Sequence, residues 1–334
     1  AWREAAGAWE RPLGRPEAAA AALEKVLELA PDRRDAWQRL RDLYARSGNW
    51  RAYVRVTDLF TTHLTDPAER RAVLKELGEI HEKRLGQKEM AFITWCRAFG
   101  EDPSDAAVAA AAQRLAADTG AFDELAAVYE QVADEAKGVA RARLLLELGR
   151  LQDRRLDDAD AAEAAFRKAL EVDPASPEAL DALTDLFTRR GRVRDLVVAL
   201  EQKLEAAAGL EEKKATLLET ARLYDGQLHD ADEAIAALKR VLELDGADAA
   251  ALDALATLYR REGRFPDLAG ILARARDLAP DDAARVAYQL QIAGLHENEL
   301  ADDEAAVEAY RAVLGQDDRN RAALDGLERL YTKL

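Results

Sequence analysis

Apolar residues recur at spacings of three and four along almost the whole chain, with polar residues between them. This period places the apolar side chains on one face of an α-helix. Alternating β-branched runs, which are typical of strands, are rare. Turn residues interrupt the pattern about every 12 to 20 residues, among them Pro31, Pro67, Pro103, Pro174 and Pro280. The pattern therefore predicts an all-α protein of about nineteen helices joined by short turns.

Whole segments recur at a fixed interval along the chain. Residues 40–50 (LRDLYARSGNW), 183–193 (LTDLFTRRGRV) and 255–265 (LATLYRREGRF) are close copies. Four glycines share spacings of 72, 71 and 72 residues: Gly48, Gly120, Gly191 and Gly263. Self-similarity at a fixed period indicates a stacked repeat architecture, in which each unit contacts only its neighbours. Each unit holds four helices, which form two helical hairpins.

The period also predicts the domain organisation. One solenoid is expected over residues 1–334, with approximate double repeats at residues 1–66, 67–137, 138–209, 210–280 and 281–334. Residues 319–334 repeat a first helix without its partner, and the chain opens within an apparent helix. We therefore expect a fragment of a longer array, with end-to-end stacking on other chains as the alternative.

Two hairpin types alternate along the array. In the first type, typified by residues 140–172, the first helix runs to Leu156 and acidic residues cap the start of the second. In the second type, typified by residues 177–207, Gly191 supplies a left-handed residue that ends the first helix. An alanine series predicts close helix contacts: Ala19, Ala91, Ala162, Ala234 and Ala306. Larger residues share one core position: Leu23, Trp95, Phe166, Leu238 and Tyr310.

Residues of both hairpin types match a known repeat motif. In the first type they are Leu148, Gly149, Ala162, Phe166, Ala169 and Pro174. In the second type they are Trp37, Leu40, Tyr44 and Gly48. With these residues the chain resembles the tetratricopeptide-repeat family over nearly its whole length. It departs from the family in a turn about one residue longer, and in Gly246 and Asp318 at repeat boundaries. Its richness in Ala, Arg, Asp and Leu also resembles repeat proteins of GC-rich bacteria.

The resemblance implies a right-handed superhelix of antiparallel helix pairs, whose first helices line a concave groove. It further implies a scaffold that binds peptides or protein segments and is rarely a catalyst. The family's helix phase places these charged residues in the groove: Glu79, Arg150, Arg154, Asp181, Asp185, Arg189, Arg222, Asp225, Asp253 and Arg260. The alternative is that these charges only solvate a helix face.

Charge and hydropathy exclude several kinds of partner. The formal net charge is −16, from 48 Lys and Arg against 64 Asp and Glu. Nucleic acids and anionic membranes attract basic surfaces, so neither is expected as a partner. No stretch approaches 18 consecutive apolar residues, so no segment is expected to insert into a membrane.

The residues of catalytic and metal sites are present but explained by packing and capping. His81 and His296 each precede a glutamate without completing an H-E-x-x-H motif, and they share one repeat position with Trp9, Gln152 and Tyr224. Acidic pairs fall at helix starts, where they cap. The single cysteine, Cys96, is expected to be buried, and its lack of a disulfide partner favours a reducing compartment such as the cytoplasm. No cofactor or metal is expected.

These observations predict a non-catalytic scaffold that binds a peptide or protein partner on the concave surface. A structural spacer or a repeat element that assembles end to end is the alternative. A third interpretation makes the repeats an arm of a catalytic or regulatory domain that lies outside this sequence.

Overall fold

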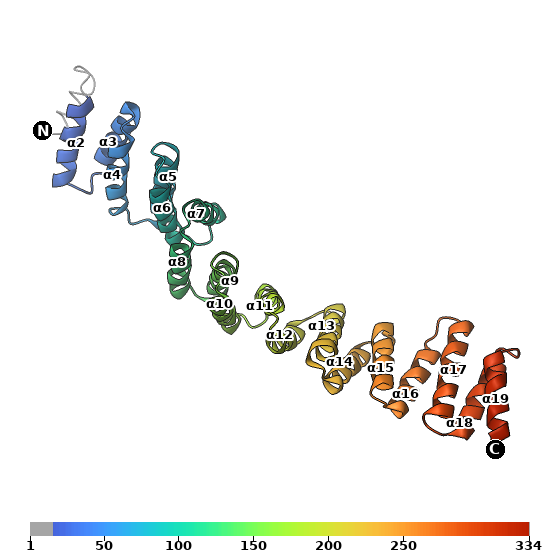
Figure 1. Ribbon diagram of the computed structural model, residues 1–334. Helices are drawn as coiled ribbons and strands as arrows, with labels where there is room; N and C mark the ends of the chain where they lie inside the picture. Colours follow the sequence, from blue (N-terminus) through green and yellow to red (C-terminus); the bar gives the residue numbers. More distant parts are fainter. Residues whose placement is uncertain (1–15, 334) are drawn as a thin grey trace. The chain divides into compact units, whose positions relative to one another are not determined.

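The computed structural model describes residues 16–333, and every regular element within that range is helical. Residues 16–333 form eighteen α-helices, α2 to α19 (Figure 1), and one π-helical turn. The all-α prediction is confirmed. The helix expected at the start of the chain lies outside the described residues.

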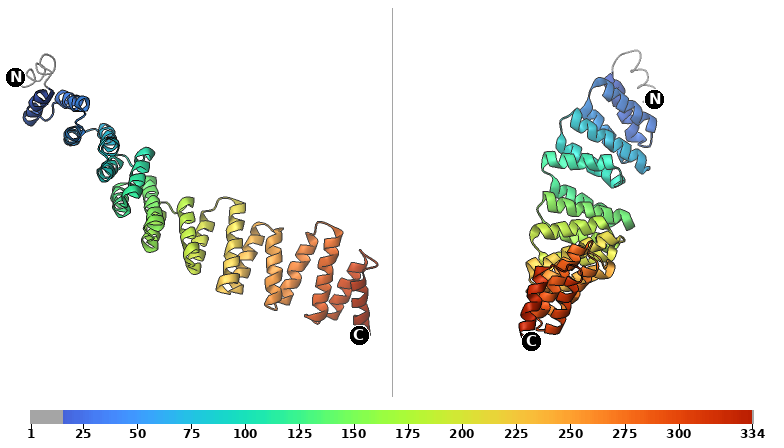
Figure 2. Two further views of the ribbon diagram at one scale, coloured as in Figure 1. Left: turned by 45° about the horizontal axis from the view of Figure 1, so that its top comes forward. Right: turned by 90° about the vertical axis from the view of Figure 1, so that its right-hand side faces the viewer.

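The helices fall into two compact units, one ending at Pro174 and one beginning at Ala175. The first contains α2 (Pro16–Leu29), α3 (Arg34–Ser47), α4 (Trp50–Thr61), α5 (Pro67–Lys83), α6 (Lys88–Glu101), α7 (Ala106–Thr119), α8 (Phe122–Glu135), α9 (Gly138–Arg155) and α10 (Ala159–Val172). The second contains α11 (Pro177–Arg190), α12 (Val193–Ala206), α13 (Leu210–Leu223), the π turn η1 (Tyr224–Leu228), α14 (Ala231–Leu244), α15 (Ala249–Arg261), α16 (Phe265–Asp277), α17 (Asp282–Asn298), α18 (Asp303–Leu314) and α19 (Arg321–Lys333). Within each unit, successive hairpins pack side by side, as in an α-solenoid (Figures 1 and 2).

The hairpins of the second type, which we call short hairpins, have a glycine in the turn between their two helices, as expected. Gly48, Gly120, Gly191 and Gly263 have φ of 69°, 78°, 65° and 68°. After α7, the amides of Gly120 and Ala121 both donate to the carbonyl of Ala116, at 2.8 and 3.1 Å. Only glycine adopts this left-handed conformation without a steric cost, which explains its place in each copy.

The hairpins of the first type, which we call long hairpins, have a different turn between their two helices. Their left-handed residues occupy one repeat position: Gly86, Asp157, His229 and Ala301, with φ of 64°, 53°, 53° and 52°. The amide that follows each of them donates to a carbonyl six residues earlier, for example from Asp158 to Gln152 at 2.9 Å and from Asp302 to His296 at 3.0 Å. The turn is wider than a simple glycine cap, in agreement with the longer turn seen in the sequence. Three of the four copies hold a non-glycine residue in a conformation that L-residues disfavour.

The repeated core positions are buried as predicted. All five alanines of the series have no exposed surface. The larger series is also buried, from Leu23 at 0% to Trp95 at 6% exposure. A Cβ added at Gly149 would lie 2.5 Å from the Phe166 ring, so this helix contact requires glycine. In the next copy, where Leu238 replaces the ring, the position of Gly149 is filled by Ala221.

Helix α7 is an exception within the core. The other short hairpins place two large residues and an aromatic ring on the core side of their first helix, as in Leu252, Leu255 and Tyr259 of α15. The equivalent residues of α7 are all alanine: Ala109, Ala112 and Ala116. Phe99 replaces a leucine of the other copies, and Tyr129 replaces a leucine of the second unit; the two rings fill part of the space with centroids 4.9 Å apart. As a result α7 packs closely on α6 and only lightly on α8.

Candidate functional site

The exposed side of consecutive first helices forms what we term the first-helix face. In the second unit it carries two hollows, of about 320 Å³ between α13 and α15 and about 420 Å³ between α15 and α17. Asp253 and Thr257 line both, so the two form one continuous α13–α17 groove. Tyr288 and Gln291 of α17 complete its far wall.

The first unit has a larger hollow at the equivalent place. It lies between α7 and α9 over α8 and measures about 820 Å³. Its walls include Ala109, Ala110 and Leu144, with Arg143 and Glu147 among the charged residues. Val139, at its edge, is 77% exposed. The hollow is wider and more apolar than the groove because α7 contributes alanines where other copies contribute large side chains.

Four of the ten predicted groove residues line the α13–α17 groove: Arg222, Asp225, Asp253 and Arg260. The structure thus brings together the residues chosen on α13, its π extension and α15. Arg260 donates to Gln291 Oε1 across the groove at 3.2 Å, which ties α15 to α17. Arg222 and Asp253 are exposed on the groove wall.

The other six predicted residues line none of these hollows, and most are engaged in ion pairs. Glu79 pairs with Lys83 at 2.9 Å, and Asp181 accepts from Lys203 at 2.6 Å. The remaining pairs are Arg150 with Glu147 at 2.7 Å and Asp185 with Arg189 at 3.3 Å. Arg154 is exposed in the last turn of α9.

A repeated carboxylate on the first-helix face ties neighbouring hairpins together. Glu82 accepts two bonds from Arg114, at 2.7 and 2.8 Å, and Glu297 accepts two from Arg329, both at 2.9 Å. Asp225 occupies the same repeat position and pairs with Arg261 at 2.6 Å. The guanidinium bonds lower the pKa of Glu82 and Glu297 below the usual range for glutamate. Asp225 is therefore committed to a neighbouring helix, which leaves Arg222, Asp253 and Arg260 as the predicted residues of the groove that a partner can reach.

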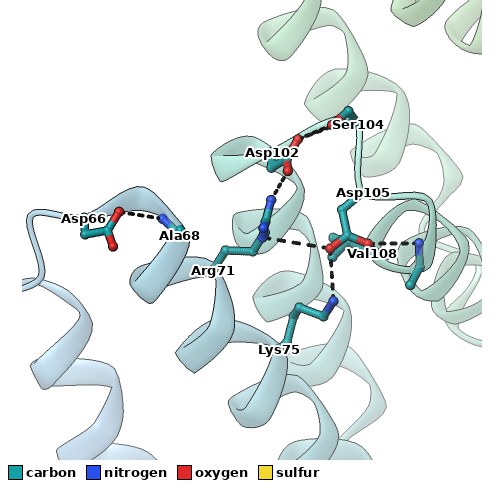
Figure 3. Close-up of polar contacts among 9 residues, drawn as sticks. Asp66, Ala68, Arg71, Lys75, Asp102, Ser104, Asp105 and Val108 are labelled. Atoms are coloured by element: carbon teal, nitrogen blue, oxygen red, sulfur yellow. Dashed lines mark hydrogen bonds and ion pairs between the residues drawn. The ribbon is translucent and has the colours of Figure 1, made fainter.

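A second polar cluster joins α5 to the turn before α7 (Figure 3). Arg71 contacts Asp102, and Lys75 donates to Asp105 at 3.0 Å. Asp105 also accepts from the amide of Val108 at 3.2 Å and so caps α7. The hydrogen bond from Lys75 is the main reason that the pKa of Asp105 is lowered. The cluster fastens one hairpin to the next.

The second unit repeats this fastening with one lysine. Lys214 of α13 contacts Asp245 at 2.7 Å and Asp248 at 2.8 Å. Asp248 caps α15 by accepting from the amide of Ala251. Bonds to Lys214 lower the pKa of both aspartates, and the two aspartates raise the pKa of Lys214.

The histidines and the cysteine occupy packing positions. His81 is buried with Nδ1 3.0 Å from Gln87 Oε1, and His296 is half-buried with Nδ1 3.9 Å from Asp302. Gln152 and Tyr224 are half-buried at the same repeat position, which confirms that prediction, while Trp9 lies outside the described residues. Cys96 is buried as predicted, and burial raises the pKa of its thiol to about 12.

Within residues 16–333, no three His, Cys, Asp or Glu side chains are grouped so that they could hold a metal ion. No helix in that range is both long and apolar enough to cross a bilayer. Acidic residues at helix starts act as caps, as predicted: Asp158, Asp281 and Asp302 accept from backbone amides at 2.9, 2.7 and 3.0 Å.

Sequence reasoning missed the hollow between α7 and α9. Its signal was the alanines at Ala109, Ala112 and Ala116, where other copies carry Leu or Trp, then Leu, then an aromatic residue. A pattern of recurring large residues reveals the shared core positions, but it does not reveal a copy in which those residues are missing.

Models of the tetratricopeptide repeat match three segments of the chain, residues 11–33, 142–176 and 251–285. The last two segments cover α9–α10 and α15–α16, one hairpin of each type. No curated protein matches the chain.

Several solved structures are similar in part. The C-terminal part of a TPR repeat-containing protein from Cytophaga hutchinsonii has 17% identity and a TM-score of 0.37, over 76% of this chain and 99% of that one. YrrB, described as a TPR protein with an unusual peptide-binding site, has 16% identity and a TM-score of 0.32, over 56% and 92%. MamA has 20% identity and a TM-score of 0.32, over 53% and 92%. These TM-scores are too low to carry an argument, so the likeness to the tetratricopeptide repeat rests on the repeat matches and the hairpins.

Proposed function

Because this chain is a tetratricopeptide-repeat protein, we propose that it is a non-catalytic scaffold that binds a segment of a partner protein on its first-helix face. The repeat fold supports a protein–protein interaction scaffold. The observation that carries the choice of face is the continuous α13–α17 groove, where charged residues chosen from the sequence line two adjoining hollows.

The groove chemistry favours a partner segment with both charge signs. Arg222 and Arg260 offer donors to a carboxylate, and Asp253 between them offers an acceptor to a basic side chain. Tyr288 adds a half-buried aromatic surface, the kind of residue that often dominates binding energy. Because exposed ion pairs are each worth only about 0.2–1 kcal/mol, such a partner is held by several contacts rather than by one.

The test compares charge reversals on two faces of the second unit. The native chain, Arg260→Glu with Asp253→Lys, and Arg194→Glu are immobilised, and retained cell proteins are quantified by mass spectrometry. Arg194 is an exposed arginine on the second helix α12, so it is a matched control. We expect a set of proteins that the native chain and the control retain and that the groove variant loses. Identical retention by all three would reject the groove.

An apolar surface on α19 supports a second candidate, a spacer that assembles through α19. Leu324 is 46% exposed and Tyr331 is 51% exposed, whereas Leu330 is buried at 1%. Leu324→Asp therefore alters this surface without entering the core. Light scattering distinguishes the candidates, because a stacking element loses concentration-dependent assembly in this variant, whereas a scaffold keeps its mass.

A further inference from the structure

A second surface of the first unit lies between the second helices α6 and α8. This α6–α8 crevice has a volume of about 760 Å³. Its floor is apolar, formed by Phe92, Ile93 and Cys96 of α6 with Val128 and Val132 of α8. It adjoins the hollow between α7 and α9, with which it shares Gly100, Val132 and Glu135, and it involves none of the residues of the α13–α17 groove.

The exposed isoleucine is peculiar to this copy of the repeat. Ile93 is 49% exposed at the crevice. Its equivalents in the other copies are Ala21, Ala164, Ala236 and Glu308, which are small or charged. Packing between hairpins therefore does not require an isoleucine here, and its apolar surface is available to a partner.

Carboxylates surround the apolar floor without cations of their own. Glu89, Glu124 and Glu135 line the crevice, and within residues 16–333 none of the three has an ion-pair partner. The two arginines of the wall are engaged elsewhere. Arg70 pairs with Glu101 at 2.7 Å, and Arg97 pairs with Asp58 at 2.5 Å.

The equivalent place in the second unit shows what is missing. There Arg264, at the start of α16, contacts Asp232 and Asp267, both at 3.0 Å. These aspartates occupy the repeat positions of Glu89 and Glu124. The position of Arg264 is taken by Ala121 in the crevice. The first unit therefore keeps both acidic residues and has lost the arginine that joins them.

We propose that the α6–α8 crevice binds an amphipathic helix of a partner protein, with a basic residue at the end of the helix's apolar stripe. The partner's cation takes the place between Glu89 and Glu124 that the Arg264 guanidinium fills in the second unit. Its apolar side chains cover Ile93, Val128 and Val132, in the manner of a helix in a groove. The charge complementarity selects a basic partner over an acidic one.

The spacing of the acidic residues defines the partner further. Glu124 and Glu135 are eleven residues apart on α8, which corresponds to about 16 Å along a helix. A partner helix with a second basic residue about three turns from the first reaches both ends of the crevice.

A designed peptide provides the probe. It is an amphipathic helix with leucines on one face and arginines eleven positions apart, and its companion carries glutamates in place of the arginines. Affinity for the intact chain is measured by fluorescence anisotropy at low and high salt. We expect the arginine peptide to bind the native chain, more tightly at low salt, and the glutamate peptide to fail to bind.

Variants of the chain then locate the binding site. Ala121→Arg supplies the missing cation internally, and the backbone allows it because Ala121 has φ −83° and ψ 50° against −86° and 61° at Arg264. We expect Ala121→Arg, Ile93→Asp, and Glu89→Gln with Glu124→Gln each to weaken binding about tenfold. Glu130→Gln, on the same helix outside the crevice, is the matched control and leaves the affinity unchanged.

These measurements distinguish binding in the α6–α8 crevice from binding on the first-helix face. Equal affinity of Ala121→Arg and the native chain, or equal binding of the two peptides, would overturn it, as would no binding of the arginine peptide. Loss of binding in Ala121→Arg without loss of thermal stability supports it. Arg260→Glu, in the α13–α17 groove, leaves peptide affinity unchanged if the proposal is right.

Discussion

Helices α7 and α15 occupy the same place in two copies of the repeat that lie two periods apart, yet they meet their partner helices differently. Leu252, Leu255 and Tyr259 pack α15 into a continuous core with α16. The corresponding alanines of α7 leave α7 and α8 lightly packed on each other, with two hollows along α8. The period therefore determines the backbone, whereas side-chain volume at a few positions decides where the array presents apolar surface.

The comparison also shows how the structure compensates for lost volume. Phe99 of α6 and Tyr129 of α8 stand where the second unit carries leucines, and they are buried at 2% and 3% exposure. The compensation is partial, because Ile93 and Val139 remain 49% and 77% exposed beside the two hollows. We infer that packing between α7 and α8 is weaker than in the other short hairpins, and that apolar surface beside α8 is more accessible as a result.

The largest effect is expected when α15 is made like α7. Leu255 has no exposed surface, and its equivalent in α7 is Ala112. Leu255→Ala should cost about 2–5 kcal/mol of unfolding free energy, because it removes buried methyl groups and leaves a cavity. Urea unfolding followed by circular dichroism measures the change. A loss below about 1 kcal/mol would show that this position carries little packing energy in either copy.

A medium effect is expected at the matched pairs of small and large residues. Gly149→Ala places a Cβ within 2.5 Å of the Phe166 ring, and the resulting overpacking should cost about 1–3 kcal/mol. Adding Phe166→Leu recreates the Ala221 and Leu238 pair of the second unit and should recover part of the loss. Thermal melts of the single and double variants test this coupling, and a double variant less stable than Gly149→Ala would contradict it.

A smaller effect of opposite sign is expected at the turns of the long hairpins. Gly86 and Ala301 share a left-handed conformation, at φ 64° and 52°. Gly86→Ala should cost about 1 kcal/mol, and Ala301→Gly should stabilise by a similar amount, because only glycine adopts this φ without strain. The two unfolding free energies are compared with that of the native chain. Changes of the same sign would refute the backbone explanation.

The smallest effect is expected from the single lysine that fastens the second unit. Lys214 lowers the pKa of Asp245 and Asp248, so the stability from these bonds is present above about pH 4 and is lost as the pH falls through the lowered values. Lys214→Met should therefore be less stable than the native chain at neutral pH. The difference should vanish in acid, which thermal melts across the pH range would reveal. A constant difference at all pH values would exclude this electrostatic origin.

Most of the fold followed from the repeat alone. The alanine series, the large core series and the four turn glycines all lie where the period predicts, because each satisfies a contact or a φ value that recurs with the backbone. The division at Pro174 was not predicted, nor was the left-handed residue of the wide turn, since Asp157, His229 and Ala301 carry no glycine signal.

The candidate site was predicted less completely. Helix phase placed Arg222, Asp253 and Arg260 on the groove, but it gave no information about which charges neighbouring hairpins consume. Asp225 was chosen for the groove, yet it pairs with Arg261, a contact that depends on the distance between hairpins. The α6–α8 crevice was missed because it depends on the absence of an arginine, which Ala121 replaces in this copy.

The alanine face of α7 has a mechanical consequence. Neighbouring helices in a repeat array hold together mainly through their shared surface, so the contact with the smallest side chains is the first to separate. Heating or stretching the chain should open the seam between α7 and α8 while the copies on either side stay folded. Backbone amides of α7 would then exchange their hydrogens with solvent sooner than those of α15, its better-filled counterpart.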